Sequence, residues 1–475
     1  MILKNKKKYN YTIIGGGISG LATLHSLMEK HKGQPNVKIR LLEKAPTLGG
    51  TIKTVQIGGC LIETGPNGFL DSKPRTLEFL NELGLTDQII CADESAKIRY
   101  ICDQYQLSPL PTKPKEFFHF PLLTFSQKIR VLFEFFVGRG RFLNETVYDF
   151  GCRRLGARFT ELFLDSMVSG IFAGDSKDLV LREAFPRIHQ LERTYGSLFL
   201  AMLQIGRKRR KALGRKRTKA SPVGSPTGSL KSLQKGMGQV IEKLALNYSD
   251  KIQTGCEVIS ITQNDQKIYQ IQTRTEVIES DKVILCVPAH VAGQITTELS
   301  SNLSESLKKV PYSPVAVVGM IFDQKVKEKL PKGFGYLIPG NNNREVLGVL
   351  FDSQVYPSRA PENKTLIRLM IGGARHPKVT CLSMDELQQL AKDELRHVLG
   401  IKDVPVEFYC HLWEDAIPQY NLAYLEAKQE ILKELETLSG LEIVSNYIGG
   451  ISFNDCVHNA HQTVEKISND PESKE

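Results

Sequence analysis

Residues 11–21 of the chain read YTIIGGGISGL, in which a short apolar run leads into glycines spaced as G-x-G-x-x-G. The run predicts a buried parallel strand, and residues 21–28 continue with the apolar spacing of a helix. Gly15 permits a sharp turn, Gly17 lets a pyrophosphate approach the backbone, and Gly20 lets the helix pack closely against the strand. The N–H groups and the dipole at the helix N-terminus also favour phosphate. The stretch therefore predicts the βαβ unit of a dinucleotide-binding domain.

A second strand is predicted at residues 38–43, and it ends on Glu43. An acid at that place can accept hydrogen bonds from ribose hydroxyls. Two further glycines follow at Gly49 and Gly50, where the backbone can again approach a phosphate, and a compact glycine-proline turn follows at 65–68. This order resembles the flavin amine oxidase superfamily and favours FAD. The alternative, a nicotinamide dehydrogenase, would not require the double glycine at this spacing.

The composition bounds the class of protein. A chain of 475 residues is long enough for more than one domain, and its apolar content of 41% is ordinary for a soluble globular protein. Its nine cysteines include no C-x-x-C pair, which favours reduced thiols and a cytoplasmic location over a disulfide framework. The apolar run after the basic N-terminus is too short to predict a signal peptide, and no run is long enough to predict a transmembrane helix. No His/Cys cluster has the spacing of a metal site.

The formal net charge of +10 has a local source. Residues 207–219 read RKRRKALGRKRTK, with nine Lys or Arg and no acid, and a segment rich in Ser, Pro and Gly follows at 221–229. A solvated loop is the favoured interpretation, and attraction to anionic lipid is the alternative. Nucleic acid is not predicted as a partner, because the run lacks interleaved aromatic residues and a recognisable reader fold.

Eight of the 21 phenylalanines lie between Phe117 and Phe142, among Lys, Arg and Gln side chains. This composition suits an element that lies on a membrane surface or lines a substrate channel. An ordinary core helix would show the same pattern, so both interpretations stay open. Under the first, the protein binds peripherally to the cytoplasmic face of a membrane.

The pattern of strands and helices predicts an α/β protein: a Rossmann-like FAD-binding domain with an inserted mixed α/β substrate domain and a helical membrane-associated domain. Strands predicted near 252–261 and 283–288 would return to the first domain, so its sequence is expected to be discontinuous. A helix is predicted at 230–246, and a strand, a double glycine and a helix start at 447–457. The expected segments are 1–90, 230–300 and 431–475 for the FAD-binding domain, 91–210 for the helical domain and 301–430 for the substrate domain.

Further motifs are spread over the whole chain. They are ETGPNGFLDSKP from residue 63, SGIFAGD from 169, GFGYLIP from 333, LGVLF from 347, LIRLMIGGAR from 366, HLWEDAIPQYN from 411 and NYIGGISFNDC from 446. Together with the glycine motifs, they resemble the protoporphyrinogen oxidase family, oxygen-dependent flavoenzymes that act near the end of haem synthesis. The basic run at 207–219 departs from the family, but it falls where the family has a variable surface loop.

The resemblance implies cofactor roles for residues from both ends of the chain. Glu43 would meet the ribose, the backbone of Val258 the adenine, and Trp413 would lie near the flavin ring, although its residue type alone favours a core position. The residues implied to bind FAD are Gly15, Gly17, Ser19, Gly20, Glu43, Lys44, Gly49, Gly50, Gly65, Pro66, Asn67, Val258, Trp413, Asp455, Cys456 and Val457.

The same resemblance implies a substrate site. Arg99 matches an arginine that pairs with a substrate propionate, and Gly174 matches a backbone position near the substrate. Arginine suits bidentate binding of a carboxylate, but its pattern in this sequence would not single it out. The apolar residues implied to sandwich the tetrapyrrole rings, which would be assigned to the core on pattern alone, are Leu337, Leu350 and Met370.

The implied reaction removes six hydrogens from protoporphyrinogen IX and gives protoporphyrin IX, with molecular oxygen as acceptor and peroxide as by-product. FAD carries the hydride chemistry and the protein supplies an apolar slot and a cation, so neither a catalytic side chain nor a metal is assigned. Three alternatives stay open: oxidation of coproporphyrinogen III to coproporphyrin III, an amine oxidase, and a flavin-binding membrane protein without turnover. An amine oxidase would need an aromatic cage, which the sequence does not clearly show. The oligomeric state is also open, with a homodimer among the options.

Overall fold

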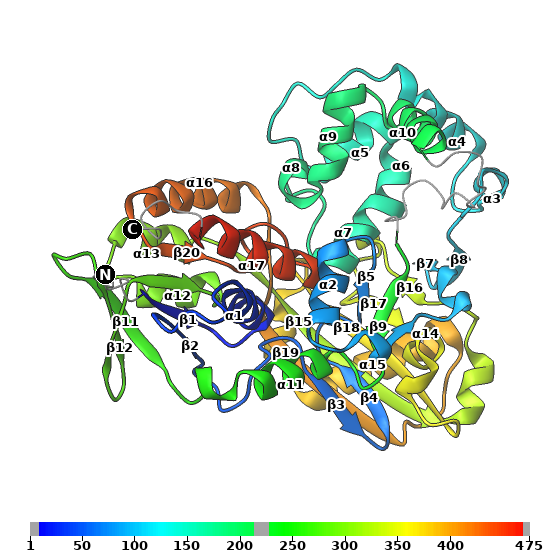
Figure 1. Cartoon of the computed structure of the whole chain (residues 1–475). Coiled ribbons are helices and arrows are strands. Elements are labelled where there is room, and N and C mark those ends of the chain that lie inside the picture. Colours follow the sequence, from blue (N-terminus) through cyan, green and yellow to red (C-terminus); the bar gives the residue numbers. More distant parts are fainter. Residues whose placement is uncertain (1–8, 213–227, 469–475) are drawn as a thin grey trace.

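The computed structural model of the chain describes residues 9–212 and 228–468 (Figure 1). These residues form a parallel α/β domain, a large mixed sheet and a group of helices, which lies at the top right of Figure 1. The predicted class, α/β with a Rossmann-like dinucleotide-binding domain, is confirmed by the parallel sheet that contains the glycine-rich stretch.

A five-stranded parallel sheet forms the centre of the dinucleotide-binding domain. Residues 11–14 of its central strand are all buried, because both faces of a parallel sheet are covered. The strands come from both ends and the middle of the chain, so the domain is discontinuous in sequence. Their order is β10 (Ile252–Gln253), β2 (Val37–Leu42), β1 (Tyr9–Ile14), β14 (Lys282–Leu285) and β20 (Leu441–Ile443).

Helices cover both faces of this sheet. Leu21, Leu24 and Leu27 form the fully buried stripe of the first helix and join the core on one face, which confirms the predicted helical spacing. The elements on that face are α1 (Ile18–Lys30), α2 (Pro74–Glu82), α11 (Gly238–Asn247) and α17 (Phe453–Ser468). The elements on the other face are α12 (Ala289–Ile295), α13 (Ser301–Lys308), α16 (Leu422–Thr437), β11 (Val258–Gln263), β12 (Tyr269–Thr273) and β13 (Val277–Ser280).

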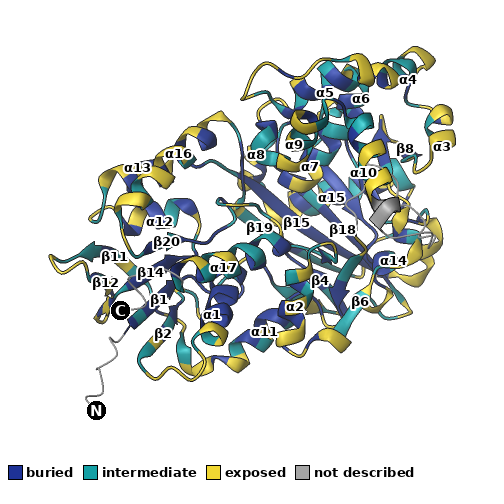
Figure 2. Ribbon diagram, turned by 45° about the horizontal axis from the view of Figure 1, so that its top comes forward, coloured by how far each residue is buried: buried dark blue, intermediate teal, exposed yellow. Residues whose placement is uncertain are grey.

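A seven-stranded sheet forms the second large unit. One face packs against α15 (Met384–Leu399), where alternate strand residues such as Val318 and Leu369 join a shared core. In Figure 2 the central strands β15 and β18 are mostly dark blue, that is, buried. The strand order is β19 (Glu407–Pro418), β15 (Tyr312–Asp323), β18 (Lys364–Gly372), β17 (Val346–Leu350), β16 (Gly335–Leu337), β7 (Tyr100–Asp103) and β8 (Gln106–Pro109).

The segment 91–210, predicted as the helical domain, begins with a β-hairpin instead of a helix. The hairpin of β7 and β8 belongs to the seven-stranded sheet, because β7 pairs in parallel with β16. The hairpin turns at Gln104 and Tyr105, whose φ angles are 49° and 63°. Such two-residue turns usually carry Asn or Gly, so the sequence lacked the ordinary signal for a hairpin here.

Helices fill the rest of this segment. Their core contains the fully buried Arg154, which pairs with Glu134 and, at 2.7 Å from its Nε, with Glu192. Pairing of this kind is what allows charged side chains to be buried. The basic run at 207–219 begins in the last helix and continues into residues outside the described ranges. The helices are α3 (Pro114–His119), α4 (Phe125–Leu132), α5 (Val147–Leu155), α6 (Ala157–Phe159), α7 (Ser166–Phe172), α8 (Leu181–Ala184), α9 (Pro186–Tyr195) and α10 (Leu198–Ala212).

Two predicted elements are wrong in detail. Residues 230–246 do not form one helix: β9 (Leu230–Leu233) pairs with β5 (Phe69–Leu70) and β6 (Ile89–Cys91), and α11 starts only after a turn at Gly236 with φ of 94°. The strand expected at 447 is absent from the described structure, which places β20 at 441–443 instead. The double glycine does precede a helix, α17, as predicted.

Candidate functional site

The glycine-rich loop uses its three motif glycines in two ways. A Cβ on Gly15 would lie 2.5 Å from the carbonyl oxygen of Cys286, and a Cβ on Gly20 would collide with the carbonyl oxygen of Gly15. These two glycines therefore permit close packing of β1, α1 and β14. A Cβ on Gly17 would meet no described atom within 4 Å, so Gly17 faces open space. Gly17 caps α1, and the buried Ser19 lies in the first turn of that helix.

Glu43 joins this loop to the segment that carries Val258. Its carboxylate accepts hydrogen bonds from the backbone N–H groups of Gly16, at 2.5 Å, and Ala45, at 2.8 Å. The carbonyl of Glu43 accepts the N–H of Cys256 at 2.9 Å, two residues before Val258. Lys44 reaches the same segment, because its Nζ pairs at 2.7 Å with Glu257, which directly precedes Val258. The structure thus brings Glu43 close to Val258, as adenosine binding requires.

The double glycine lies directly against the first loop. Gly49 donates a hydrogen bond to the carbonyl of Gly16 at 2.8 Å and pairs with Gly17 in an isolated bridge. Gly49 and Gly50 have φ angles of 112° and 57°, which L side chains rarely adopt. Backbone from both glycine motifs therefore lies together at the N-terminus of α1.

The glycine-proline turn at 65–68 connects the two glycine loops to the seven-stranded sheet. A Cβ on Gly65 would collide with the carbonyl of Thr51, which follows the double glycine. Trp413 of β19 donates its indole N–H to the carbonyl of Thr64 at 2.8 Å, directly before Gly65 and Pro66. Both polar side-chain atoms of Asn67 are buried without a hydrogen-bond partner among the described residues. Such an orphaned amide indicates a ligand at this turn.

The start of α17 completes the predicted cofactor set. The Asp455 carboxylate accepts the hydroxyl of Ser452 at 2.6 Å and pairs with Lys73, so its oxygens already have partners. Cys456 and Val457 point into the core shared with α1. Any cofactor role of these two residues must therefore come from the backbone of the helix start and not from their side chains.

These features fit FAD. Gly17 and the double glycine leave backbone open to a pyrophosphate at the N-terminus of α1, and Glu43 and Val258 lie together for the adenosine. Asn67 and Trp413 would stand at the ring end, where the unpartnered amide offers both a donor and an acceptor. FAD, when bound there, would supply a hydride acceptor.

The predicted substrate residues share one face of the seven-stranded sheet, opposite to α15. In the strand register Leu337 of β16 pairs with Gly348 of β17, which pairs with Met370 of β18. Leu350 is two residues beyond Gly348 and therefore points to the same face. Met370 and Trp413 belong to one apolar cluster on this face. The sheet thus places the apolar residues and Trp413 on a common surface.

Arg99 lies at the edge of the same surface. It directly precedes β7, and continuing the register of β7 and β16 by one residue sets it beside Gly335, whose partner on β17 is Leu350. Its guanidinium lies over the ring of Phe334 at 5.1 Å from the centroid. Arg99 is exposed, yet burial by the surrounding protein lowers the pKa of its guanidinium. The cation therefore lies at the solvent-accessible edge of this surface, beside the ring of Phe334.

Gly174 lies in a buried turn after α7. A Cβ there would be 2.5 Å from Oε1 of Gln419, so the turn closes tightly against that side chain. Ala173, its neighbour, belongs to the same apolar cluster as Met370 and Trp413. The turn therefore borders the predicted substrate surface.

Sequence reasoning missed two polar residues next to Trp413. The ring of His411 is 4.1 Å from the Trp413 ring, centroid to centroid, and Nζ of Lys53 is 5.8 Å from the latter. Burial, and next the charge of Lys53, lower the pKa of His411, which favours the neutral imidazole. His411 stands in the same motif as Trp413, which begins at residue 411, but no motif links Lys53 to them. The signal for Lys53 arises only from the contact of the 53–64 ribbon with β19.

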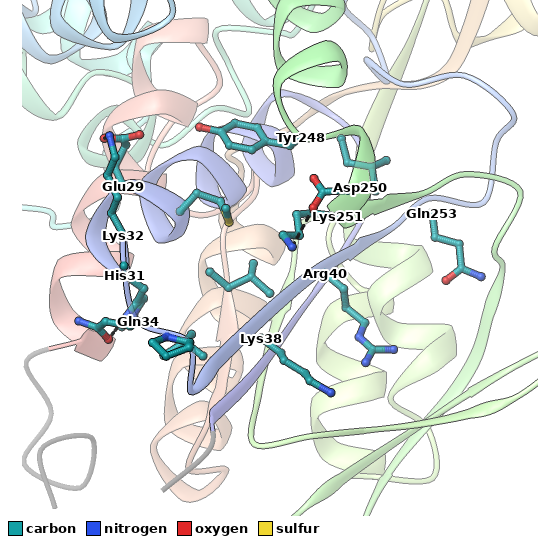
Figure 3. Close-up of a pocket in the computed structure, with 16 residues that line it drawn as sticks. Glu29, His31, Lys32, Gln34, Lys38, Arg40, Tyr248, Asp250, Lys251 and Gln253 are labelled. Carbon is teal, nitrogen blue, oxygen red and sulfur yellow. Dashed lines mark hydrogen bonds and ion pairs between the residues drawn. The ribbon is translucent and has the colours of Figure 1, made fainter. Parts of the chain in front are cut away.

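A large hollow of about 1030 Å³ opens at another place, the outer edge of the five-stranded sheet (Figure 3). Its lining, which includes Lys38, Arg40 and Tyr248, contains none of the predicted site residues. No group of His, Cys, Asp or Glu within residues 9–212 and 228–468 is placed to hold a metal ion.

Comparisons with known proteins show the family of the chain. The model of the flavin containing amine oxidoreductases matches residues 18–468. A chloroplastic protoporphyrinogen oxidase of Oryza sativa subsp. japonica is 30% identical, over 96% of this chain and 87% of the relative. A coproporphyrinogen III oxidase of Bacillus subtilis (strain 168) is 26% identical, over 95% of this chain and 96% of the relative.

The fold also matches solved structures. The structure of a candidate protoporphyrinogen oxidase from Exiguobacterium sp. 255-15 superposes with a TM-score of 0.81 at 23% identity, covering 98% of this chain and 99% of the other. The matching model spans nearly the whole chain, from the first helix to the last. The chain is therefore an oxidoreductase of the flavin containing amine oxidoreductase family, and its cofactor is FAD.

Proposed function

We propose that the protein oxidises protoporphyrinogen IX to protoporphyrin IX, with FAD as cofactor and molecular oxygen as the acceptor that forms peroxide. The observation that carries this proposal is the shared sheet face. It sets a cation, Arg99, at the edge of an apolar surface that continues through Leu350 and Met370 to Trp413. A flat apolar substrate with propionates at its rim fits this arrangement. The chloroplastic relative named above is a protoporphyrinogen oxidase.

The residues of the chain then have positional roles. Leu337, Leu350 and Met370 bind the apolar rings, and Arg99 orients them by pairing with a propionate. The cofactor supplies the hydride acceptor, and the sheet face keeps the substrate next to the turn at Asn67. No side chain is needed as a named base, because pyrrole N–H protons can pass to water.

Oxidation of coproporphyrinogen III is the second candidate, favoured by the Bacillus relative of that name. The two substrates differ at the rim, since the second carries two more propionates in place of the vinyl groups. Arg99 and Lys53 both border this face, and neither makes an ion pair with an acid within the described residues, so the cations do not separate the two substrates. The protoporphyrinogen oxidase of Oryza is more similar to this chain than the Bacillus relative, at 30% against 26% identity, so we place protoporphyrinogen first.

An aerobic fluorescence assay on both porphyrinogens tests the proposal. We expect porphyrin to form from protoporphyrinogen IX with a higher kcat/KM than from coproporphyrinogen III, together with peroxide. A higher kcat/KM on coproporphyrinogen III would reverse the order of the two candidates. Bound FAD that neither porphyrinogen reduces under anaerobic conditions would refute both.

The phenylalanine cluster supports peripheral attachment of the protein to a membrane. Phe125, Phe136 and Phe142 are each at least 74% exposed, while Phe120 is buried in a local core. Arg139 and Arg141 are exposed beside them. Within the described residues, no helix is both long and apolar enough to span a bilayer. An exposed group of rings with adjacent cations is the composition of a surface that enters the interfacial layer of a membrane.

Replacing Phe125, Phe136 and Phe142 together by serine is expected to reduce binding to anionic vesicles more than tenfold. Each ring contributes roughly 1.5–3 kcal/mol when it leaves water. Sedimentation with vesicles measures the bound fraction. The matched control replaces two similarly exposed residues outside the cluster by serine: Leu246 on α11 and Val404 in the loop before β19. Equal binding of both variants and the wild type would show that the rings do not contact lipid.

A further inference from the structure

The turn after α7, residues 172–176, is held by groups from two distant segments. The carbonyl of Phe172 accepts a hydrogen bond from Nε2 of Gln419 at 2.8 Å, and the carbonyl of Ala173 accepts the N–H of Ala374 at 2.7 Å. Ala173 has a φ of 47°. A residue with a Cβ keeps this left-handed conformation only where its surroundings hold it, so the contacts determine the shape of the turn.

Arg375 adds the charged part of this attachment. Its Nε and Nη2 donate to the two carboxylate oxygens of Asp175 at 2.8 and 2.9 Å, and Nη2 also reaches Asp165, which precedes α7. Asp165 in turn accepts the hydroxyl of Ser176 at 2.6 Å. One guanidinium therefore ties the end of β18 to both ends of α7. We call Arg375, Asp165 and Asp175 the α7 clamp.

The pKa shifts of Arg375 and Asp175 both favour the charged forms of this pair. Burial opposes charge on Arg375, but the hydrogen bond and charges of its two carboxylates outweigh this effect and raise its pKa. Burial likewise opposes charge on Asp175, but the hydrogen bond from Arg375 outweighs it and lowers the pKa of that carboxyl. The geometry is therefore fixed by ionic hydrogen bonds, which are the stronger kind.

The clamped elements form a wall of the substrate surface. Ala173 packs in one cluster with Val317 and Met370. A Cβ on Gly170 of α7 would lie 2.8 Å from Cδ2 of Leu337, so the helix rests directly on that side chain. Arg375 lies five residues beyond Met370 on the same segment. A shift of the clamp would therefore move the wall relative to the Leu337 and Met370 row.

We propose that Arg375 is a positioning residue, which sets the width of the porphyrinogen slot by holding α7 and its turn at a fixed distance from β18. The inference rests on the proposed function and adds a specificity element to it. Within the described residues, the hydrogen bonds and ion pairs of Arg375 go to Asp165 and Asp175, and not to the turn at 65–67 or to Arg99. Its loss should therefore weaken substrate binding more than it slows turnover of bound substrate.

Steady-state kinetics on FAD-loaded Arg375→Gln, Arg375→Lys and Asp175→Asn tests the inference. We expect Arg375→Gln to raise KM about tenfold and to change kcat less than twofold. Arg375→Lys should recover only part of this change, because an ammonium keeps the charge but not the fork. The double variant Arg375→Gln with Asp175→Asn should be no worse than the poorer single variant, since both act on one contact.

A second readout does not depend on turnover. Trp413 is the only tryptophan of the chain and lies on the slot surface. Quenching of its fluorescence by added protoporphyrin IX therefore reports porphyrin affinity, and we expect that affinity to fall about tenfold in Arg375→Gln. The variants Arg375→Lys and Asp175→Asn carry the test if Arg375→Gln does not fold.

The matched control is Arg344→Gln. Arg344 pairs with Glu394 and is also largely buried, with 10% of its side chain exposed, but that pair lies toward α15 on the opposite face of the sheet. The control should lower the melting temperature and leave KM and porphyrin affinity unchanged. If the wild type is active but the Arg375 variants keep its KM and porphyrin affinity, the clamp only stabilises the fold and does not position the substrate. Wild type that oxidises neither porphyrinogen would instead refute the proposed function, and this inference with it.

Discussion

Gly17→Val is expected to give a folded protein without its yellow cofactor. A Cβ at this position meets no described atom, and the φ of −73° is open to any residue, so the fold itself tolerates the side chain. The free space lies at the N-terminus of α1, where the pyrophosphate of FAD approaches the backbone. The isopropyl group would occupy that space and hold the phosphates away from the helix N–H groups.

The ratio of visible flavin absorbance to protein absorbance measures the effect, and circular dichroism reports the fold. Gly20→Val is the matched control, because its Cβ would collide with the backbone of Gly15. That variant should lose fold and cofactor together, whereas Gly17→Val should lose the cofactor only. Bound FAD stabilises the native state, so Gly17→Val should melt at a lower temperature than the FAD-loaded wild type. Its melting temperature should equal that of the wild type from which FAD has been removed. A yellow Gly17→Val protein with full flavin content would overturn the assignment of this loop.

Arg99→Ala is expected to lower kcat/KM about 10- to 100-fold while FAD stays bound. The guanidinium stacks on Phe334 and has no acidic partner among the described residues, so its donors are free for a substrate carboxylate. The macrocycle is otherwise an apolar disc that could bind in several orientations. A charge-assisted pair typically contributes roughly 1.5–3 kcal/mol, which corresponds to the expected loss.

Steady-state kinetics on the purified variants decides this role. Arg99→Lys should recover part of the loss, because lysine keeps the charge but cannot form two parallel hydrogen bonds. Arg396→Ala is the control, since Arg396 is an exposed arginine on α15, away from the slot, with 52% of its side chain exposed. If Arg99→Ala retained wild-type kcat/KM and flavin content, Arg99 would be an ordinary surface residue.

The dinucleotide-binding fold and its FAD cofactor could be predicted because their determinants are local. The spacing of Gly15, Gly17 and Gly20 encodes a turn and a helix start within ten residues. Gly15 and Gly20 are required by close packing, whereas Gly17 leaves open space. The acid at Glu43 ends the next strand, as the pattern indicates. Contiguous patterns of this kind reflect backbone geometry, which nearby residues determine.

Errors arose where a pairing partner lay far along the chain. The hairpin at 100–109 carries no turn signal and is stabilised as a sheet edge by β16, more than 200 residues later. Residues 230–233 are strand because β5 and β6 flank them, although their composition also suits a helix. Local propensity is weak, and tertiary pairing overrides it.

By itself, the sequence determined the dinucleotide-binding loop and, through family motifs, the choice of flavin and the candidate substrate residues. Only the tertiary structure decided that Arg99, Leu350, Met370 and Trp413 share one sheet face, because their strands come from segments over 300 residues apart and meet through register. The α7 clamp is likewise invisible in the sequence. Arg375, Asp165 and Asp175 are ordinary charged residues until packing brings them within hydrogen-bond distance, where burial makes their pairing strong and specific.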